Sequence, residues 1–319
     1  MIPAYNEEAN IDELAERLEA VFDSEQSYDF EVILIENGSH DATFERALAA
    51  NERDHRFKVL QLSRNFRMDG GLTAGLNYAT GDAAVLMAAD LQDPPELIHE
   101  FLRKWEEGFD IVYQVVTERQ GTGPIRRMNS QLFYWLAGKL TDGRIPRNVS
   151  DFRLVDRRVY ETVNVMEERN RFVRGLFAWV GFTSVGVEHE RPPRTGGVSG
   201  AHTFGVIDLA FKGIFAHSYK PLRLISLFGL FLSGLSFLAI VVLAVLAFTV
   251  GVPFAGFGTI VCLFLLMFGF LFTMLGIVSE YVGLIYEEVK QRPNFVVRRE
   301  VGLAERPERS LARGADVVD

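Results

Sequence analysis

The chain has no Asp, Glu, Lys, Arg or His between Leu224 and Ser279, although such residues are common elsewhere in its sequence. Soluble cores rarely contain so long an uncharged stretch, and about 20 apolar residues suffice for a helix to cross a bilayer. Gly251 and Pro253 divide the stretch. It therefore predicts two transmembrane helices, over about Ile225–Phe248 and Phe257–Val278, with a helical hairpin buried in a soluble core as the alternative.

Cysteine is almost absent as well. The single cysteine, Cys262, lies inside the second predicted span, so an internal disulfide framework is excluded. No spacing of His or Cys typical of metal ligands occurs. The net charge of −9 argues against a nucleic-acid partner.

Basic residues flank the uncharged stretch on both sides. Lys220 and Arg223 precede it, and Lys290 and Arg292 follow it. The positive-inside rule places both flanks in the cytoplasm. Because no N-terminal signal peptide is visible, we expect a multi-pass protein of the inner (cytoplasmic) membrane, with its globular part and both termini cytoplasmic.

Short apolar runs alternate with helical patterns before the membrane segment. This alternation predicts an α/β fold with a mostly parallel sheet covered by helices on both faces. The expected strands are Phe30–Ile35, Lys58–Leu62, Ala83–Met87 and Asp110–Gln114, and the expected helices are Glu8–Phe22, Ala42–Asn51, Gly70–Ala79 and Glu96–Glu107. Ile2 stands where a first strand should already be ending, which suggests a start codon assigned too late or a shortened chain.

Four segments are expected along the chain. A globular domain covers residues 1–200, and an amphipathic region over 201–223 is typical of a helix lying in the membrane interface. The transmembrane hairpin covers 224–280. The cytoplasmic C-terminal segment, 281–319, is expected to be partly disordered because its end is charged and poor in aromatic residues.

Four polar loops follow the first four strands, and the carboxyl ends of parallel strands share one rim of a sheet. The loops are IPAYNEE (Ile2–Glu8), IENGSHDAT (Ile35–Thr43), LSRNFRMDGG (Leu62–Gly71) and ADLQDPPE (Ala89–Glu96). Their side chains suit hydrogen bonding to a base and a ribose, with a cation at a diphosphate. Taken singly, NGSHD is also an ordinary turn before a helix.

Several motifs together resemble the family 2 glycosyltransferases that charge polyprenyl phosphates, such as dolichol-phosphate mannose synthases and GtrB-type bactoprenol glucosyltransferases. The resemblance runs from Ile2 to about Pro293. It rests on IPAYNEE, LSRNF, ADLQDPPE, DFRLVDRR (Asp151–Arg158), FVRGLFAWVGF (Phe172–Phe182) and YVGLIYEEVKQRP. It implies a Rossmann-like GT-A catalytic domain, a nucleotide-sugar donor, Mg²⁺ or Mn²⁺, and a polyprenyl-phosphate acceptor.

The same resemblance assigns the donor side of the site. Asp90 and Gln92 match metal-contacting positions, whereas Ala88 replaces the first Asp of the usual DxD motif. Mg²⁺ needs only one or two protein carboxylates when a diphosphate supplies oxygens, so we expect a cation here. The positions that match donor contacts are Pro3, Ala4, Tyr5, Glu7, Glu36, Asn37, Ser39 and Asp90, with Glu36 and Asn37 standing where the family usually has two aspartates.

The acceptor side is assigned to Arg126, Ser130, Arg194 and Asp151. Arg126 and Ser130 are four residues apart, on one face of a predicted helix, where they could hold a phosphate or simply form a solvated basic face. Arg194 matches a phosphate-binding arginine, but Gly200 replaces a usual lysine. Asp151 would accept a hydrogen bond on the acceptor side or orient Arg153, and a helix cap is the alternative.

These expectations lead to one main hypothesis: inverting transfer of glucose from UDP-glucose to undecaprenyl phosphate, or a similar lipid, at the cytoplasmic membrane face. One alternative is transfer to a glycolipid hydroxyl, which needs a general base. The other is a catalytically impaired membrane protein that binds nucleotide sugar, suggested by Asn37, Ala88 and Gly200. Homo-oligomerisation stays open.

Overall fold

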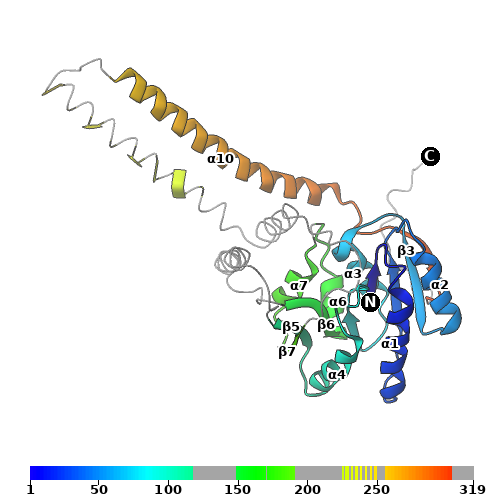
Figure 1. Ribbon diagram of the computed structural model, residues 1–319. Coiled ribbons are helices and arrows are strands. Elements are labelled where there is room, and N and C mark those ends of the chain that lie inside the picture. Colours follow the sequence, from blue (N-terminus) through cyan, green and yellow to red (C-terminus); the bar gives the residue numbers. More distant parts are fainter. Residues whose placement is uncertain are drawn as a thin grey trace, which may run out of the picture.

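The structure is a computed structural model, which describes residues 1–117, 149–169, 171–190 and 256–303, together with single helical positions between 225 and 249 (Figure 1). Strands and helices alternate through the first part of the chain as predicted. They are β1 (Ile2–Ala4), α1 (Ile11–Ser24), β2 (Val32–Glu36), α2 (Thr43–Arg53), β3 (Phe57–Leu62), α3 (Arg67–Tyr78), β4 (Ala83–Leu86), the 3₁₀ turn η1 (Pro95–Leu97), α4 (Ile98–Glu106) and β5 (Ile111–Thr117).

The later elements complete the domain and extend from it. They are β6 (Val149–Asp156), α6 (Arg157–Asn164), α7 (Val173–Trp179), β7 (Ser184–Glu190), α10 (Phe257–Lys290) and β8 (Val297–Val301). The predicted interfacial helix at 201–223 lies outside the described residues, as does the chain beyond residue 303.

The strands form two hydrogen-bonded sets, β1-β2-β3-β8 and β4-β6-β5-β7. Met1 joins them, because its amino group donates to the Val85 carbonyl at 2.8 Å and its carbonyl accepts from the Met87 amide at 3.2 Å. Across this link the strand order is β8-β3-β2-β1-β4-β6-β5-β7.

The sheet is mixed, so the prediction of a mostly parallel sheet is confirmed only in part. The pairs β1-β2, β2-β3 and β5-β7 are parallel, whereas β3-β8, β4-β6 and β5-β6 are antiparallel. Alternation of strand and helix predicts parallel pairing only for strands joined by helical crossovers. β6 and β8 instead enter the sheet after long excursions of the chain, and each runs against its neighbours.

β2 lies between β1 and β3, inside the sheet, and is buried along its whole length. All five of its residues, VILIE, are buried, as is typical of a strand covered on both faces. Its side chains alternate: Val32 and Leu34 pack into a core with α1, while Ile33 and Ile35 pack with Ala74 of α3. Helices on both faces of the sheet therefore hold β2 in place, and with it the loop that follows.

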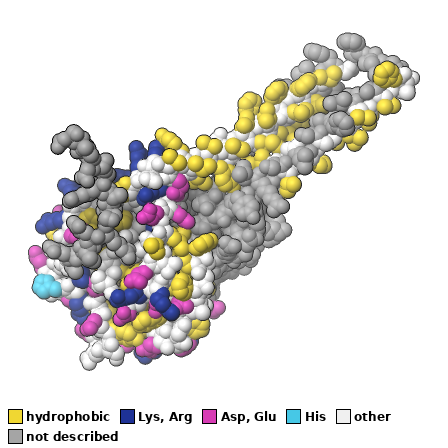
Figure 2. All heavy atoms as spheres, turned by 180° about the vertical axis from the view of Figure 1, so that it is seen from behind, with side chains coloured by type: hydrophobic (Ala, Val, Ile, Leu, Met, Phe, Trp, Pro, Cys, Tyr) yellow, Lys and Arg dark blue, Asp and Glu magenta, His cyan; other side chains and the backbone are white. Residues whose placement is uncertain are grey.

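α10 is a single helix that projects away from the sheet and carries apolar side chains along its length (Figures 1 and 2). Within the described part of the chain, its segment Leu266–Lys290 alone is long and apolar enough to cross a membrane, with a mean hydropathy of 1.8. The helix starts at Phe257, where the second span is predicted, but continues past Val278 to Lys290.

The first predicted span is described only at scattered positions, and these are helical. One of them, Phe228, places its ring 5.4 Å from the ring of Phe270 on α10. The first of the two predicted transmembrane helices, over about Ile225–Phe248, thus stays a prediction.

Candidate functional site

The loops after β1 and β2 are joined by hydrogen bonds at the carboxyl edge of the sheet. The Asn6 amide donates to Ser39 Oγ at 3.1 Å, and the His40 amide donates to Asn6 Oδ1 at 2.9 Å. The Glu7 amide also donates to Thr43 Oγ1 at 2.8 Å. The two loops predicted to bind the donor therefore form one unit, from which the side chain of Tyr5 is exposed.

Glu36 and Asn37, two of the positions predicted to contact the donor, are both buried. Glu36 accepts a hydrogen bond from the Ser39 amide. Asn37 Nδ2 donates to the Arg67 carbonyl and its Oδ1 accepts from the Phe66 amide, each at 2.9 Å. An aspartate could not make the first of these bonds, because a carboxylate only accepts. Asparagine at this position therefore holds the loop between β3 and α3.

Two glycines allow this close packing. Gly38 has a φ of +70°, and a Cβ there would lie 2.5 Å from the Arg64 carbonyl carbon. A Cβ on Gly71 would lie 2.9 Å from Pro3 Cβ. Close approach at these two glycines thus shapes the donor side of the site.

The fourth loop contains two aspartates in different surroundings. Asp93 is buried, where its Oδ2 accepts from the Ala88 amide and its Oδ1 from Ser150 Oγ, both at 3.3 Å. Asp90 is half-buried, and its Oδ1 accepts from the Gln92 amide at 3.2 Å. Asp93 therefore ties the loop to β6, and Asp90 is left as the carboxylate nearer to solvent.

These residues fit a cation only together with a substrate. In the ranges that the structure covers, no group of three or more His, Cys, Asp or Glu could hold a metal ion. Asp90 supplies one carboxylate, and Mg²⁺ is commonly bound by one or two carboxylates plus substrate phosphates. The chemistry of the donor set thus agrees with a metal held jointly with a diphosphate.

Asp151 lies near the start of β6, beside the loop that Asp93 anchors. Arg174 of α7 binds both oxygens of the Asp151 carboxylate: Nε donates to Oδ1 at 2.9 Å, and Nη2 donates to Oδ2 at 2.7 Å. The helix-cap alternative for Asp151 is wrong, because Asp156 caps the next helix by accepting from the Arg158 amide. Arg153 Nε donates to the backbone carbonyl of Asp151 at 3.3 Å.

Burial also changes the pKa of Arg153, which falls to about 10. The guanidinium is desolvated and lies 5.3 Å from the centre of the Phe177 ring, while Nη2 donates to the Ser150 carbonyl at 2.9 Å. Arg153 therefore fixes the backbone of β6 at two consecutive carbonyls, those of Ser150 and Asp151.

Asp69 is a residue that the sequence reasoning missed. It lies in the first turn of α3, and its Oδ1 accepts from the Val173 amide at 2.9 Å. Burial raises its pKa to about 6, and the negative charge of Asp151 acts in the same direction. An acidic residue in the first turn of a helix is common, so nothing in the sequence marked it.

Three predicted acceptor residues, Arg126, Ser130 and Arg194, lie outside the described residues, as does Gly200. Their roles stay predictions. The nucleotide and metal roles of the donor residues also stay predictions, although their loops lie at one edge of the sheet.

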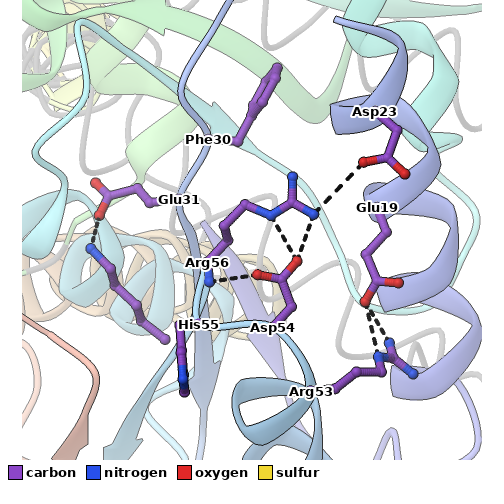
Figure 3. A pocket seen from close by; sticks show the side chains of 9 residues that line it. Glu19, Asp23, Phe30, Glu31, Arg53, Asp54, His55 and Arg56 are labelled. Carbon is purple, nitrogen blue, oxygen red and sulfur yellow. Dashed lines mark hydrogen bonds and ion pairs between the residues drawn. The ribbon is translucent and has the colours of Figure 1, made fainter. Parts of the chain in front are cut away.

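A hollow of about 760 Å³ lies elsewhere, at the amino ends of β2 and β3 (Figure 3). Its arginines and its lysine are each paired: Arg53 with Glu19 at 2.9 Å, Arg56 with Asp54 at 2.6 Å and Lys58 with Glu31 at 2.5 Å. Its charges compensate one another, and it is on the edge opposite the predicted site.

Comparison with known proteins identifies the family. Residues 1–163 match the family described as "Glycosyl transferase family 2". The chain is 38% identical over 303 residues to the "Uncharacterized glycosyltransferase YkcC" of Bacillus subtilis, covering 95% of this chain and 94% of that protein. It is 35% identical over 301 residues to the "SfII prophage-derived bactoprenol glucosyl transferase" of Shigella flexneri, covering 94% and 96%.

Among solved structures, it is similar to glucosyl-3-phosphoglycerate synthase from Mycobacterium tuberculosis in complex with Mn²⁺, uridine-diphosphate and phosphoglyceric acid. That match has 20% identity and a TM-score of 0.46, and covers 67% of this chain and 74% of the other. The chain belongs to glycosyltransferase family 2, as its motifs suggested. It is a glycosyltransferase with a GT-A fold built on a mixed sheet.

Proposed function

We propose that this enzyme transfers glucose from UDP-glucose to undecaprenyl phosphate, or a similar polyprenyl phosphate, at the cytoplasmic face of the inner membrane. The observation that carries the proposal is the 35% identity to a bactoprenol glucosyl transferase over nearly the full length of both chains. A long apolar helix attached to the catalytic domain agrees with a lipid acceptor.

The reaction is a single displacement. An oxygen of the acceptor phosphate forms a bond to the anomeric carbon as the bond from that carbon to the diphosphate breaks. The nucleoside diphosphate leaves with the electron pair, and the anomeric configuration inverts. A phosphate monoester loses its second proton near pH 6, so the acceptor is already a nucleophile at neutral pH and needs no strong general base.

The catalytic domain's task is therefore to position two substrates. Asp90 and Gln92 would hold Mg²⁺ or Mn²⁺, which neutralises charge on the leaving diphosphate when bound. On the acceptor side, Asp151, Arg126, Ser130 and Arg194 would hold the lipid phosphate in line. The base and ribose would contact the joined first and second loops, through Pro3, Ala4, Tyr5, Glu7, Glu36, Asn37 and Ser39.

The membrane arrangement is part of the proposal. Two helices, over about Ile225–Phe248 and from Phe257, would form a hairpin whose two ends are cytoplasmic. The contact between Phe228 and Phe270 supports the placement of the two segments side by side. Such a hairpin would keep the site near the headgroup of its lipid acceptor.

The assay is incorporation of labelled glucose into the lipid fraction by the purified full chain with UDP-glucose, Mg²⁺ and undecaprenyl phosphate. We expect a product that depends on the lipid phosphate, and none from the Asp90→Ala variant. No transfer from any common nucleotide sugar would refute the proposal. Transfer to a glycolipid alcohol but not to the lipid phosphate would favour the second acceptor class.

A further inference from the structure

Two contacts join α7 to two other elements of the candidate site, α3 and β6. Arg174 binds both oxygens of Asp151 on β6, at 2.9 and 2.7 Å. The preceding residue, Val173, donates its amide to Asp69 of α3 at 2.9 Å. The start of α7 is therefore held by α3 while its first arginine holds β6.

These contacts continue into the donor loops on both sides. α3 begins at Arg67, whose carbonyl accepts a hydrogen bond from Asn37 Nδ2. Asn37 belongs to the second loop and is buried next to Glu36. On the other side, Ser150 precedes Asp151 and donates to Asp93 of the fourth loop. Asp151 thus lies in a chain of contacts that starts and ends at loops assigned to the donor.

We propose that Arg174 and Asp69 are positioning residues for the transfer reaction: Arg174 fixes the carboxylate of Asp151, and Asp69 fixes the backbone from which Arg174 extends. The proposal rests on the function proposed above, since it takes Asp151 as a residue of the acceptor side. Neither positioning residue needs to touch a substrate.

The geometry of each contact suits such a role. A guanidinium that binds a carboxylate through two parallel hydrogen bonds fixes its orientation as well as its distance. An arginine side chain has several rotatable bonds, so its direction depends on where its backbone is held. The bond from Val173 to Asp69 provides that hold one residue away.

The energetic cost of Asp69 supports the same role. Burial and the nearby charge of Asp151 raise its pKa, which means that the ionised carboxyl is unfavourable where it lies. The cationic groups that also act on it, Arg174 and Arg171, only partly offset this. Because the buried Asp69 carboxylate lowers the stability of the folded protein, a positioning role explains its presence better than a stabilising role does.

The test compares four variants of the full chain in the lipid transfer assay. Arg174→Gln removes the bidentate contact, and Asp69→Ala removes the acceptor of the Val173 amide. Asp69→Asn is the conservative variant, because its Oδ1 can still accept that bond. Arg53→Gln is the matched control, because it breaks an arginine–glutamate pair of similar length, 2.9 Å, at the opposite edge of the sheet.

Displacement of a positioned group by about 1 Å can cost about 100-fold in rate, so we expect kcat to fall by about 10- to 100-fold in Arg174→Gln and Asp69→Ala. The KM for the nucleotide sugar should stay unchanged. Asp69→Asn and Arg53→Gln should keep kcat near that of the wild type. Thermal unfolding of each variant identifies any loss that comes from misfolding.

Two kinetic outcomes would overturn the proposal: wild-type kcat in folded Asp69→Ala, or a loss in Asp69→Asn as large as that in Asp69→Ala. A crystal structure of Asp69→Ala gives a readout that does not depend on activity. If Arg174 still binds both oxygens of Asp151 there, Asp69 has no positioning role. If the wild type transfers no sugar to a lipid phosphate, the proposed function fails. In that case the crystal structure of Asp69→Ala alone decides whether Asp69 positions Arg174 and Asp151.

Discussion

Asp90 and Asp93 are neighbours in sequence with opposite tasks in the structure. Asp93 is inside the protein and accepts hydrogen bonds from Ala88 and Ser150, whereas Asp90 is half-buried at the start of the loop. A carboxylate that binds a metal together with a substrate must be accessible to that substrate. A carboxylate that ties two segments together needs no such access. The two alanine variants should therefore differ in what they lose.

Asp90→Ala is expected to abolish sugar transfer while the free energy of unfolding stays near that of the wild type. Asp93→Ala leaves the partly buried Ala88 amide and the buried Ser150 hydroxyl without this acceptor, which should cost about 1–3 kcal/mol of stability. Chemical denaturation and the transfer assay measure both quantities. Wild-type turnover in Asp90→Ala would remove this residue from the mechanism.

Asp69 predicts a pH dependence of stability. Its pKa is about 6 in the folded protein, against about 3.9 in an unfolded chain. The folded state therefore binds more protons between these values, and this group's contribution to stability falls as the pH rises through that window. Above it, the ionised carboxyl carries the full cost of its burial.

Asp69→Asn should remove that cost, because the amide has no charge to desolvate and can still accept from Val173. Each pKa unit corresponds to about 1.4 kcal/mol, so the variant should gain at most about 3 kcal/mol at pH 8 and less at pH 5. Thermal unfolding in detergent at both pH values measures the gain. A gain of equal size at both would show that ionisation of Asp69 is not its cause.

At the scale of elements, β8 returns the chain from α10 to the catalytic sheet. It pairs antiparallel with β3, from Val301 opposite Val59 to Val297 opposite Leu62, and the hydroxyl of Tyr78 donates to Glu300. The end of α10 is tied to the same domain, because Glu288 accepts from the Arg169 amide at 2.8 Å. The apolar helix and the sheet are thus connected through a strand rather than through a linker alone.

Truncation after Asn294 should destabilise the catalytic domain. It removes β8 and Phe295 and leaves the edge of β3 unpaired, where a free strand edge favours aggregation. We expect a lower Tm and faster hydrogen exchange at β3 amides. Truncation after Leu303, which keeps β8, is the reference, and equal Tm values for the two would contradict a structural role for β8.

At the scale of the whole molecule, the single cysteine reports on α10. Cys262 lies on this helix, within the second predicted span. If α10 crosses the membrane, a membrane-impermeant maleimide should not label Cys262 in intact vesicles and should label it after denaturation in detergent. Labelling of native Cys262 in sealed vesicles would contradict the span.

Orientation can be read from the same experiment. A cysteine introduced at the exposed Glu52 of α2 should react in inside-out vesicles and stay unlabelled in right-side-out vesicles. Glu52 lies on the catalytic domain, so this result would place that domain in the cytoplasm. The opposite pattern would reverse the proposed topology.

Sequence patterns predicted the first half of the domain well because its elements are locally periodic. The run VILIE and its neighbours are strands because they are apolar and short, and the amphipathic helices between them were equally visible. β6 and β8 were not predicted. VSDFRLVD and VRREV contain charges within the strand, and only their partners in the sheet explain them.

The same division holds within the site. Loop composition and family motifs pointed to Asp90, Gln92 and Asp151, which are close to strands in sequence. Asp69 and Arg174 could not be connected in this way, because their positions differ by more than a hundred residues and their contacts run through Val173 and Asp151. In the sequence, Asn37 stands where the family usually has an aspartate. In the structure, its side chain makes two hydrogen bonds to the backbone, and these explain why an asparagine is suitable there.

The family, the alternation of strands and helices and the long apolar helix could all be predicted from the amino-acid sequence, because motifs, periodicity and hydropathy are properties of neighbouring residues. The tertiary structure alone decided the mixed direction of the sheet, the return of β8 and the link from Asp69 through α7 to Asp151. Those features depend on which distant segments pack together, and burial and hydrogen bonding between such segments leave no local pattern in the chain.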